Sequence, residues 1–241
     1  IDAAGLRTIH NGNEGKRATC SFEYIYFARP DSIIDRRPVH SARREMGRQL
    51  ALQAPVDADM VMGIPDSAIA AGVGYAEAAG IPYQEGLIKN RYVGRTFIQP
   101  DQKLRDLGVR LKFNPLPEVL NGKRVIVVDD SIVRGTTTPH VVNLLRSAGA
   151  KEIHLRVCAP PIVSPCHFGV DMASKGELLA AQKTIEEIRE FVGADSLEYL
   201  TVDGLFKAIG KEANHCCAAC FTGQYPIEVQ LELNKMALER N

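Results

Sequence analysis

The string from Arg124 to Thr138 (RVIVVDDSIVRGTTT) constrains the fold of this chain more than any other feature. Its apolar part, residues 125–128, is a short unbroken β-branched run, which predicts a strand buried on both faces of a sheet. Asp129 and Asp130 follow where that strand ends, and a loop and a helix are expected next. Ligands of open α/β sheets bind at the carboxyl ends of such strands, so the string predicts an α/β fold with a binding site at this point.

The loop after the two acids has the composition of an anion site. A helix N-terminus offers unpaired N–H groups and partial positive charge, and Ser131, Thr136 and Thr137 add hydroxyl donors. Gly135 lets the backbone approach a ligand closely. The acids themselves suit sugar hydroxyls or a divalent cation that accompanies a phosphate. An acidic turn before an ordinary capped helix is the plainer alternative, and a Walker loop is excluded because Gly-Lys-Ser/Thr is missing.

Short apolar runs alternate with helical patterns elsewhere, which indicates a mainly parallel sheet flanked by helices. Further strands are expected at 20–27, 59–64, 81–88 and 153–159, and helices at 41–53, 67–79, 137–148, 185–192, 204–209 and from about 226. The segment 90–122 is predicted to be a long functional loop. By domain, we expect a linker at 1–19, the core at 20–170 and a C-terminal helical appendage at 171–241.

Composition narrows the class of protein further. The chain has 241 residues, and its 29 Lys and Arg balance its 29 Asp and Glu. Zero net charge argues against a nucleic-acid coat or a membrane-surface binder, and no apolar stretch is long enough to span a bilayer. Six cysteines without a secretory signal do not predict a disulfide scaffold. We therefore expect a cytoplasmic globular protein that binds neither nucleic acid nor membrane.

A second turn, Pro65-Asp66-Ser67, ends one predicted strand and opens a helix. Taken alone, this turn is typical of a helix start in which Asp66 or Ser67 caps the first turn. Beside the acidic string, however, it stands at the same edge of the predicted sheet. It is therefore a candidate for the same site.

The long loop begins with a run of cations around Gly94. Lys89, Arg91 and Arg95 lie close together there, with Tyr92 between them. Exposed basic residues are usually only solvated. A glycine among cations is also typical of a mobile loop that closes on an anionic ligand.

The cysteines leave several kinds of site open. Cys217 and Cys220 form a CxxC pattern, which is compatible with a redox pair, half a zinc site or half an iron–sulfur site, and the spacing alone favours zinc. Cys20 and Cys166 are distant in sequence and join that pair only if the fold brings the chain ends together. Cys158 lies in an apolar run and is expected to be a core thiol.

The string VIVVDDSIVRGTT resembles the phosphoribosyl pyrophosphate signature of type I phosphoribosyltransferases. Its Ser-Ile-Val-Arg-Gly-Thr-Thr form resembles that of the amidophosphoribosyltransferase family. Gly-Ile-Pro-Asp-Ser resembles the pyrophosphate loop of this family, and KNRYVGRTF resembles its flexible active-site loop. The likeness covers nearly the whole chain and implies a type I phosphoribosyltransferase-like core.

The resemblance also implies roles for individual residues. Asp129 and Asp130 hold the ribose hydroxyls and Mg²⁺, and Ser67 is a third contact to Mg²⁺. Lys89 and Tyr92 join the two acids at the catalytic centre. The residues implied in binding the phosphate or pyrophosphate of the substrate are Pro65, Asp66, Ser67, Arg91, Arg95, Ser131, Ile132, Val133, Arg134, Gly135, Thr136 and Thr137.

Many members of this family carry a [4Fe–4S] cluster, with ligands in contexts like CSFEYIYF, SPCHFG and CCAACFTG. Four thiolates suit such a cluster chemically. Its implied role is to pin the C-terminal helices onto the core, and the chemistry does not require it, because other members lack it. Cys216 and His215 stand beside the implied set. The implied ligands are Cys20, Cys166, Cys217 and Cys220.

The implied reaction is the displacement of pyrophosphate from phosphoribosyl pyrophosphate by ammonia, which gives 5-phosphoribosylamine, the first committed step of purine synthesis. Family members begin with a glutaminase domain, which we expect to be missing here, so ammonia rather than glutamine is the expected donor. A homo-oligomer and purine nucleotide inhibitors are also implied.

Three rival functions remain open. A phosphoribosyltransferase that uses a purine or pyrimidine base would lack the cysteine set and the CSFEYIYF segment. A DNA-binding regulator that senses the sugar phosphate would carry a basic winged-helix segment. A zinc-stabilised sugar-phosphate binder would show no turnover.

Overall fold

A four-stranded parallel sheet forms the centre of the computed structural model, which describes residues 5, 7, 17–90, 92, 112–172, 174–210 and 215–229. Its strands lie in the order β4 (Met60–Gly63), β7 (Arg124–Asp129), β8 (Glu152–Val157) and β9 (Ser196–Tyr199). The inner strands are apolar on both faces: Val125–Val128 of β7 are completely buried. This burial confirms the prediction from the unbroken apolar run.

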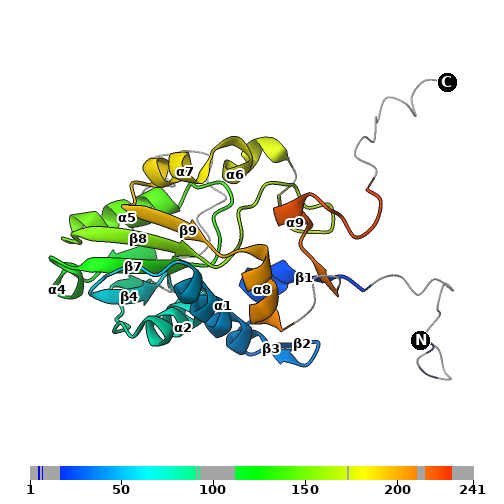
Figure 1. The fold of residues 1–241 in the computed structure, drawn as a ribbon, viewed down its shortest axis with the longest axis horizontal. Coiled ribbons are helices and arrows are strands. Elements are labelled where there is room, and N and C mark those ends of the chain that lie inside the picture. Colours follow the sequence, from blue (N-terminus) through cyan, green and yellow to red (C-terminus); the bar gives the residue numbers. More distant parts are fainter. Residues whose placement is uncertain are drawn as a thin grey trace.

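Helices cover both faces of this sheet, as Figure 1 shows. In that view α5 (Thr138–Ser147) and α7 (Ile185–Val192) lie above the sheet, and α1 (Val39–Gln53) and α2 (Ile69–Ala79) lie below it. The predicted α/β class is confirmed. The helices expected at 67–79, 137–148 and 185–192 are present within two residues of their predicted ends.

Glycines set the close contact between α1 and α2. A Cβ at Gly47 would stand 1.8 Å from the carbonyl oxygen of Ala71, and a Cβ at Gly74 would stand 1.9 Å from that of Arg44. No larger side chain fits at either position without moving a helix. The predicted helix at 41–53 begins earlier, at Val39, and Pro38 rather than Ser41 occupies its N-cap.

Part of the predicted long loop is regular structure. β5 (Leu87–Lys89) pairs antiparallel with β6 (Phe113–Pro115), and the short helix α4 (Pro117–Leu120) follows. The loop prediction is therefore wrong for residues 113–120, where Phe113 and Leu120 are buried in the core. Residues 91 and 93–111 lie outside the described part of the chain.

The two ends of the described chain meet at a second small sheet. β1 (Thr19–Cys20) pairs parallel with β10 (Cys216–Cys217), and Ser21 Oγ donates to Cys217 O at 2.7 Å. A hairpin of β2 (Ile33–Ile34) and β3 (Arg37–Pro38) follows the first end. The helices α8 (Val202–Ile209) and α9 (Ala219–Thr222) complete this side of the molecule (Figure 1).

The predicted strand at 20–27 is wrong beyond Cys20. Residues Glu23–Phe27 form a π-helical turn, η1. Tyr24 and Ile25 are both buried while the next two aromatic residues are about half exposed. Adjacent buried side chains followed by adjacent exposed ones do not match the alternation of a strand, although the residue types are those of strands.

The C-terminal region is less separate than predicted. The 171–241 segment was expected to be a helical appendage, but β9 pairs with β8 and so belongs to the central sheet. The 3₁₀ turn η2 (Lys175–Glu177) and the helix α6 (Leu179–Gln182) precede β9 along the chain. No helix starts at Pro226 within the described residues 226–229, and the remainder of that prediction, like most of the 1–19 linker, lies outside the described residues.

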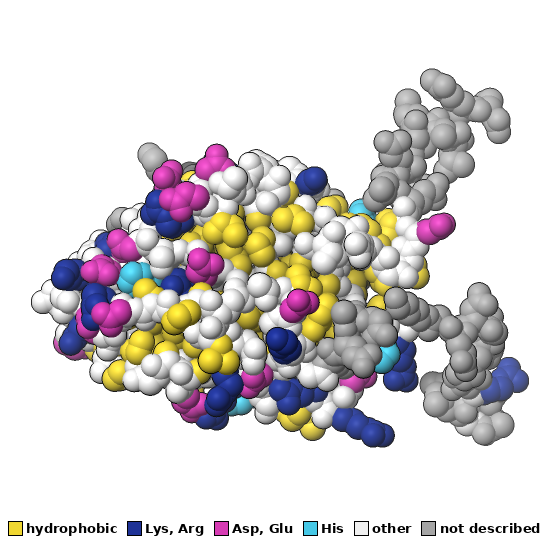
Figure 2. Space-filling view, in the orientation of Figure 1, with side chains coloured by type: hydrophobic (Ala, Val, Ile, Leu, Met, Phe, Trp, Pro, Cys, Tyr) yellow, Lys and Arg dark blue, Asp and Glu magenta, His cyan; other side chains and the backbone are white. Residues whose placement is uncertain are grey.

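The surface agrees with an ordinary globular domain. On the face seen in Figure 2, apolar side chains gather over the middle, and most charged side chains lie around the rim. In the described part of the chain, no helix is both long and apolar enough to cross a membrane.

Candidate active site

The two acids of the predicted site lie at the carboxyl end of β7. Main-chain bonds to the next strand fix them, because Cys158 N–H donates to Asp129 O at 2.9 Å and Ala159 N–H donates to Asp130 O at 2.8 Å. The N–H of Asp130 donates to Asp129 Oδ1 at 2.9 Å. Asp130 is buried and Asp129 is partly exposed.

Two hydroxyls from different loops converge on Asp130. Ser131 Oγ donates to its Oδ1 at 2.6 Å, and Ser67 Oγ, from the loop after β4, donates to its Oδ2. The strands β4 and β7 are neighbours in the sheet, so their carboxyl ends lie side by side. The structure thus brings Ser67 to the acidic pair, as the resemblance implied.

Burial makes both acids reluctant to ionise. It raises the pKa of Asp129 well above its usual range, and the charge of Asp130 raises it further. Burial also raises the pKa of Asp130, against the opposing effects of the Ser131 and Ser67 hydroxyls and of the Arg43 guanidinium. A hard cation would relieve this repulsion, and carboxylate and hydroxyl oxygens are its usual ligands.

The phosphate loop, residues 131–137, leads directly into α5. Gly135 has φ +69° and is buried, and a Cβ there would stand 2.5 Å from Leu179 Cδ2. Ile132 is only 3% exposed, so the main chain rather than the side chain of that residue faces any ligand. The loop ends at the N-terminus of α5, where a helix leaves backbone N–H groups unpaired, so the prediction that it binds an anion is retained.

The loop after β4 approaches the end of β5. Lys89 Nζ lies 2.5 Å from Asp66 Oδ2, and the Pro65–Asp66 peptide bond is cis. Lys89, Asp66 and Ser67 are therefore grouped at the edge of the sheet that carries the acids. Tyr92 is not grouped with them, because it is fully exposed and its N–H donates to Asn90 Oδ1. Arg91 and Arg95 lie outside the described residues.

The four implied cluster ligands come together from both ends of the chain. Cys20 pairs with Cys217 in the register of β1 and β10. Cys220 O accepts hydrogen bonds from the N–H groups of Val163 and Ser164, which brings the segment before Cys166 alongside. Burial raises the pKa of Cys220 to about 12, and the thiolates of Cys20, Cys217 and Cys166 raise it as well.

The donor types in this region fit a thiolate-ligated group, and all of these cysteines are free thiols. A finished cage is not formed: no three or more His, Cys, Asp or Glu side chains in the described ranges are placed to hold a metal ion. The charge of Cys217 raises the pKa of both Cys20 and Cys220. Cys158 is buried in the core, as predicted.

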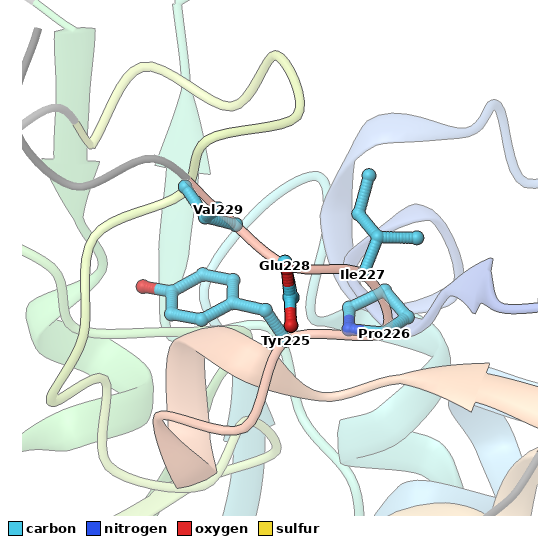
Figure 3. A pocket seen from close by; sticks show the side chains of 5 residues that line it. All are labelled: Tyr225, Pro226, Ile227, Glu228 and Val229. Atoms are coloured by element: carbon cyan, nitrogen blue, oxygen red, sulfur yellow. The ribbon is translucent and has the colours of Figure 1, made fainter.

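A shallow pocket near these cysteines is unrelated to the acids. It is lined by Tyr225 to Val229 and is drawn in Figure 3. Tyr225 Oη donates to Pro165 O at 2.7 Å, which ties this segment to the Cys166 loop. None of the residues of the phosphate loop lines the pocket.

Sequence reasoning missed a buried guanidinium behind the acids. Arg43 on α1 is 3% exposed, and it donates to Tyr24 O at 2.9 Å and to Ala28 O at 2.8 Å. A signal was present, because Arg43 stands on the helical stripe of buried positions that includes Val39 and Met46. An arginine on such a stripe indicates a buried cation that needs carbonyl or carboxylate partners.

Comparison with known proteins identifies the class of protein to which this chain belongs. A sequence model of the family described as "Phosphoribosyl transferase domain" matches residues 32–162, more than half of the chain. The chain therefore belongs to the phosphoribosyltransferase family.

Its similarity to particular relatives is higher than a shared fold requires. The amidophosphoribosyltransferase of Methanocaldococcus jannaschii is 58% identical over 215 residues, and that of Bacillus subtilis is 53% identical over 233 residues. These matches cover 89% and 95% of this chain but 45% and 49% of the relatives. The chain thus spans about half the length of the curated relatives it matches, and its resemblance to their phosphoribosyltransferase half is confirmed.

Solved structures agree with this similarity. The glutamine phosphoribosylpyrophosphate amidotransferase from B. subtilis, complexed with ADP and GMP, is 52% identical with a TM-score of 0.87 over 96% of this chain and 52% of its own. A structure described as the allosteric regulatory enzyme of purine biosynthesis is 54% identical with a TM-score of 0.83, over 90% of this chain and 48% of its own. The predicted type I phosphoribosyltransferase fold is confirmed.

Proposed function

We propose that this chain catalyses the displacement of pyrophosphate from 5-phosphoribosyl 1-pyrophosphate by ammonia, giving 5-phosphoribosylamine. The observation that carries the proposal is the convergence of Ser67, Ser131 and the two acids at the carboxyl end of β7, beside a helix N-terminus. One end of this site suits a phosphate, and the other suits ribose hydroxyls and a cation. The similarity to amidophosphoribosyltransferases supports ammonia, rather than a nucleobase, as the nucleophile.

In this proposal the protein binds and orients, and no side chain acts as a nucleophile. The 5′-phosphate lies against the phosphate loop and the start of α5, where a helix N-terminus offers unpaired N–H groups. Asp129 and Asp130 bind the ribose hydroxyls and stabilise the positive charge that develops on the sugar ring as the bond to pyrophosphate breaks. Lys89 stands at the other side of the site and can pair with pyrophosphate in place of Asp66.

A magnesium ion is proposed as the metal of the site. Ser67, Asp129 and Asp130 would hold it, because their oxygens meet around a buried carboxyl pair. When bound, the ion would neutralise charge on the departing pyrophosphate.

A [4Fe–4S] cluster is proposed at Cys20, Cys166, Cys217 and Cys220, where four free thiols adjoin. It would tie β1, β10 and α9 to the core rather than take part in the reaction. Iron and sulfide analysis of anaerobically purified protein tests this proposal. About four irons per chain are expected, and a stoichiometric zinc content would contradict it.

The remaining partners are proposed from the relatives. One similar structure is described as a complex with ADP and GMP, so purine nucleotides are proposed as inhibitors. Ammonia released from glutamine by a glutaminase domain is the proposed source of the nucleophile in the complete enzyme, in a cytoplasmic homo-oligomer.

Pyrophosphate release from phosphoribosyl pyrophosphate with Mg²⁺ tests the central proposal. We expect release with ammonium but not with glutamine, and loss of release in Asp129→Asn. Asp31→Asn is a matched control, because Asp31 is a surface acid with a side chain that is 68% exposed. If a folded chain binds the substrate but releases no pyrophosphate with either donor, the catalytic proposal is wrong.

A further inference from the structure

The segment after residue 170 forms the outer wall of the phosphate loop. Leu179 N–H donates to Val133 O at 2.9 Å. The side chain of Leu179 covers Gly135 and occupies the space that a Cβ there would need. The phosphate loop is therefore packed against a part of the chain that lies about forty residues further on.

An ion pair joins the same two segments at their surface. Arg134 Nε donates to Glu177 Oε2 at 2.7 Å, and Arg134 Nη2 lies 2.5 Å from the same oxygen. Arg134 Nη2 also lies 3.7 Å from an Asp171 carboxylate oxygen. The guanidinium is thus turned toward residues 171–177, although its position within the phosphate loop implied a contact with the substrate.

Glu177 connects this pair to the start of η2. Its Oε1 accepts from Ser174 N–H at 2.9 Å, in a capping box that Ser174 Oγ completes. One carboxylate therefore holds the first turn of η2 with one oxygen and the phosphate loop with the other. The hydrogen bond from the Ser174 N–H lowers the pKa of Glu177, and the Arg134 guanidinium lowers it further.

We propose that Arg134 and Glu177 are positioning residues, which hold the phosphate loop in its binding conformation instead of touching the substrate. The proposal rests on the proposed function, because it concerns the same phosphate loop. An anion site made of backbone N–H groups binds well only when those groups are held in place beforehand. Loss of the ion pair between Arg134 and Glu177 should therefore weaken binding of the 5′-phosphate and leave the chemical step largely unchanged.

The test compares Glu177→Gln, Arg134→Gln and the double variant in steady-state pyrophosphate release and in calorimetric titration with ribose 5-phosphate. Glutamine at 177 can still accept from Ser174 N–H, so the turn of η2 is kept while the charge is lost. We expect the KM for phosphoribosyl pyrophosphate and the Kd for ribose 5-phosphate to rise about two- to fivefold in each variant. The double variant should be no worse than Arg134→Gln alone, because that substitution already removes the interaction with Glu177.

Glu187→Gln is the matched control. Glu187 forms the same kind of capping box with Thr184 at the start of α7 but has no partner in the phosphate loop. Its KM and Kd should equal those of the unchanged chain. Thermal unfolding of every variant shows whether a loss of binding reflects a loss of folding.

Two results would overturn the proposal. If Arg134→Gln weakens binding by roughly fiftyfold or more while Glu177→Gln binds normally or more tightly, Arg134 contacts the phosphate directly. If the two substitutions weaken binding additively, the pair does not act as a unit. Absence of pyrophosphate release by the unchanged chain would instead count against the proposed function. The titration with ribose 5-phosphate would still show whether the ion pair between Arg134 and Glu177 affects phosphate binding.

Discussion

The phosphate loop and the cysteine region are built in opposite ways. The first is one continuous string in which strand, acids, loop and helix follow each other along the chain. The second is assembled from β1 at one end of the described chain and from β10 and α9 at the other. A local site can be read from its own sequence, whereas an assembled site exists only once the fold is complete. We therefore expect changes in the first region to act on catalysis and changes in the second to act on stability.

The largest expected effect is on catalysis, from Asp130→Asn. We expect pyrophosphate release to fall roughly a hundredfold or more, because the acid acts where charge develops in the reaction. A fall of less than about tenfold at saturating Mg²⁺ would show that Asp130 is not part of the reacting centre.

The same substitution, Asp130→Asn, should increase the stability of the folded chain although it lowers activity. Because the folded-state pKa of Asp130 is raised, its contribution to stability is fully present below the pKa of the unfolded chain and is lost as pH rises through the folded pKa. At pH 8 we therefore expect the Asn variant to unfold at a higher Tm than the unchanged chain. At pH 4 the gain should disappear, and a lower Tm at pH 8 would contradict this account.

Removing the proposed cluster should have the reverse effect: stability should fall while activity is retained. Chelation of iron under anaerobic conditions is expected to cost about 3 kcal/mol, or roughly 6–12 °C in Tm, because binding of a structural metal group contributes directly to folding. Ammonia-dependent release at low temperature should persist. If activity disappears while Tm is unchanged, the two regions are not separable in this way.

Arg43 tests how far the two regions are independent. Its guanidinium binds the carbonyls of the turn that follows Cys20, and its charge acts on Asp130. Arg43→Met should destabilise the chain by about 2–3 kcal/mol in urea unfolding, since buried carbonyls and acids lose their partner. Arg29→Met removes an exposed ion pair and should leave the stability almost unchanged. Equal effects in the two variants would refute the buried role of Arg43.

The smallest expected effect comes from the first turn of α7, whose Thr184 and Glu187 bind each other rather than the phosphate loop. Thr184 accepts from Glu187 N–H at the start of α7, and Thr184→Ala should cost about 1 kcal/mol. The KM for phosphoribosyl pyrophosphate should stay unchanged. An altered KM would show that α7 transmits changes to the phosphate loop.

The same contrast explains which features the sequence could predict. β4, β7, β8, the helices α2, α5 and α7, and the phosphate loop were predictable because each rests on neighbouring residues whose pattern matches one element. The π-helical turn after Cys20 was not, because its aromatic residues have strand propensity and two carbonyls at this turn, Tyr24 O and Ala28 O, are bound by Arg43 on α1.

Other features depend on partners that a single segment does not reveal. The strand β9 (SLEY) is too short and too mixed to stand out, and it is stabilised by pairing with β8. Within the site, the role of the acids could be inferred from the string itself. The direction of the Arg134 side chain could not, because it is set by Glu177 in a distant segment.

The pairing of β1 with β10 has a consequence for the order of synthesis. The hydroxyl of Ser21 donates a hydrogen bond to the carbonyl of Cys217, which lies 196 residues later along the chain. At typical translation rates of about 5–20 residues per second, the N-terminal segment waits on the order of 10–40 s for that partner to be made. During this time the Cys20 thiol has neither its neighbouring strand nor the thiols of Cys217 and Cys220, although Cys166 is made earlier. A nascent chain therefore contains both acids and the phosphate loop before it contains all four cysteines.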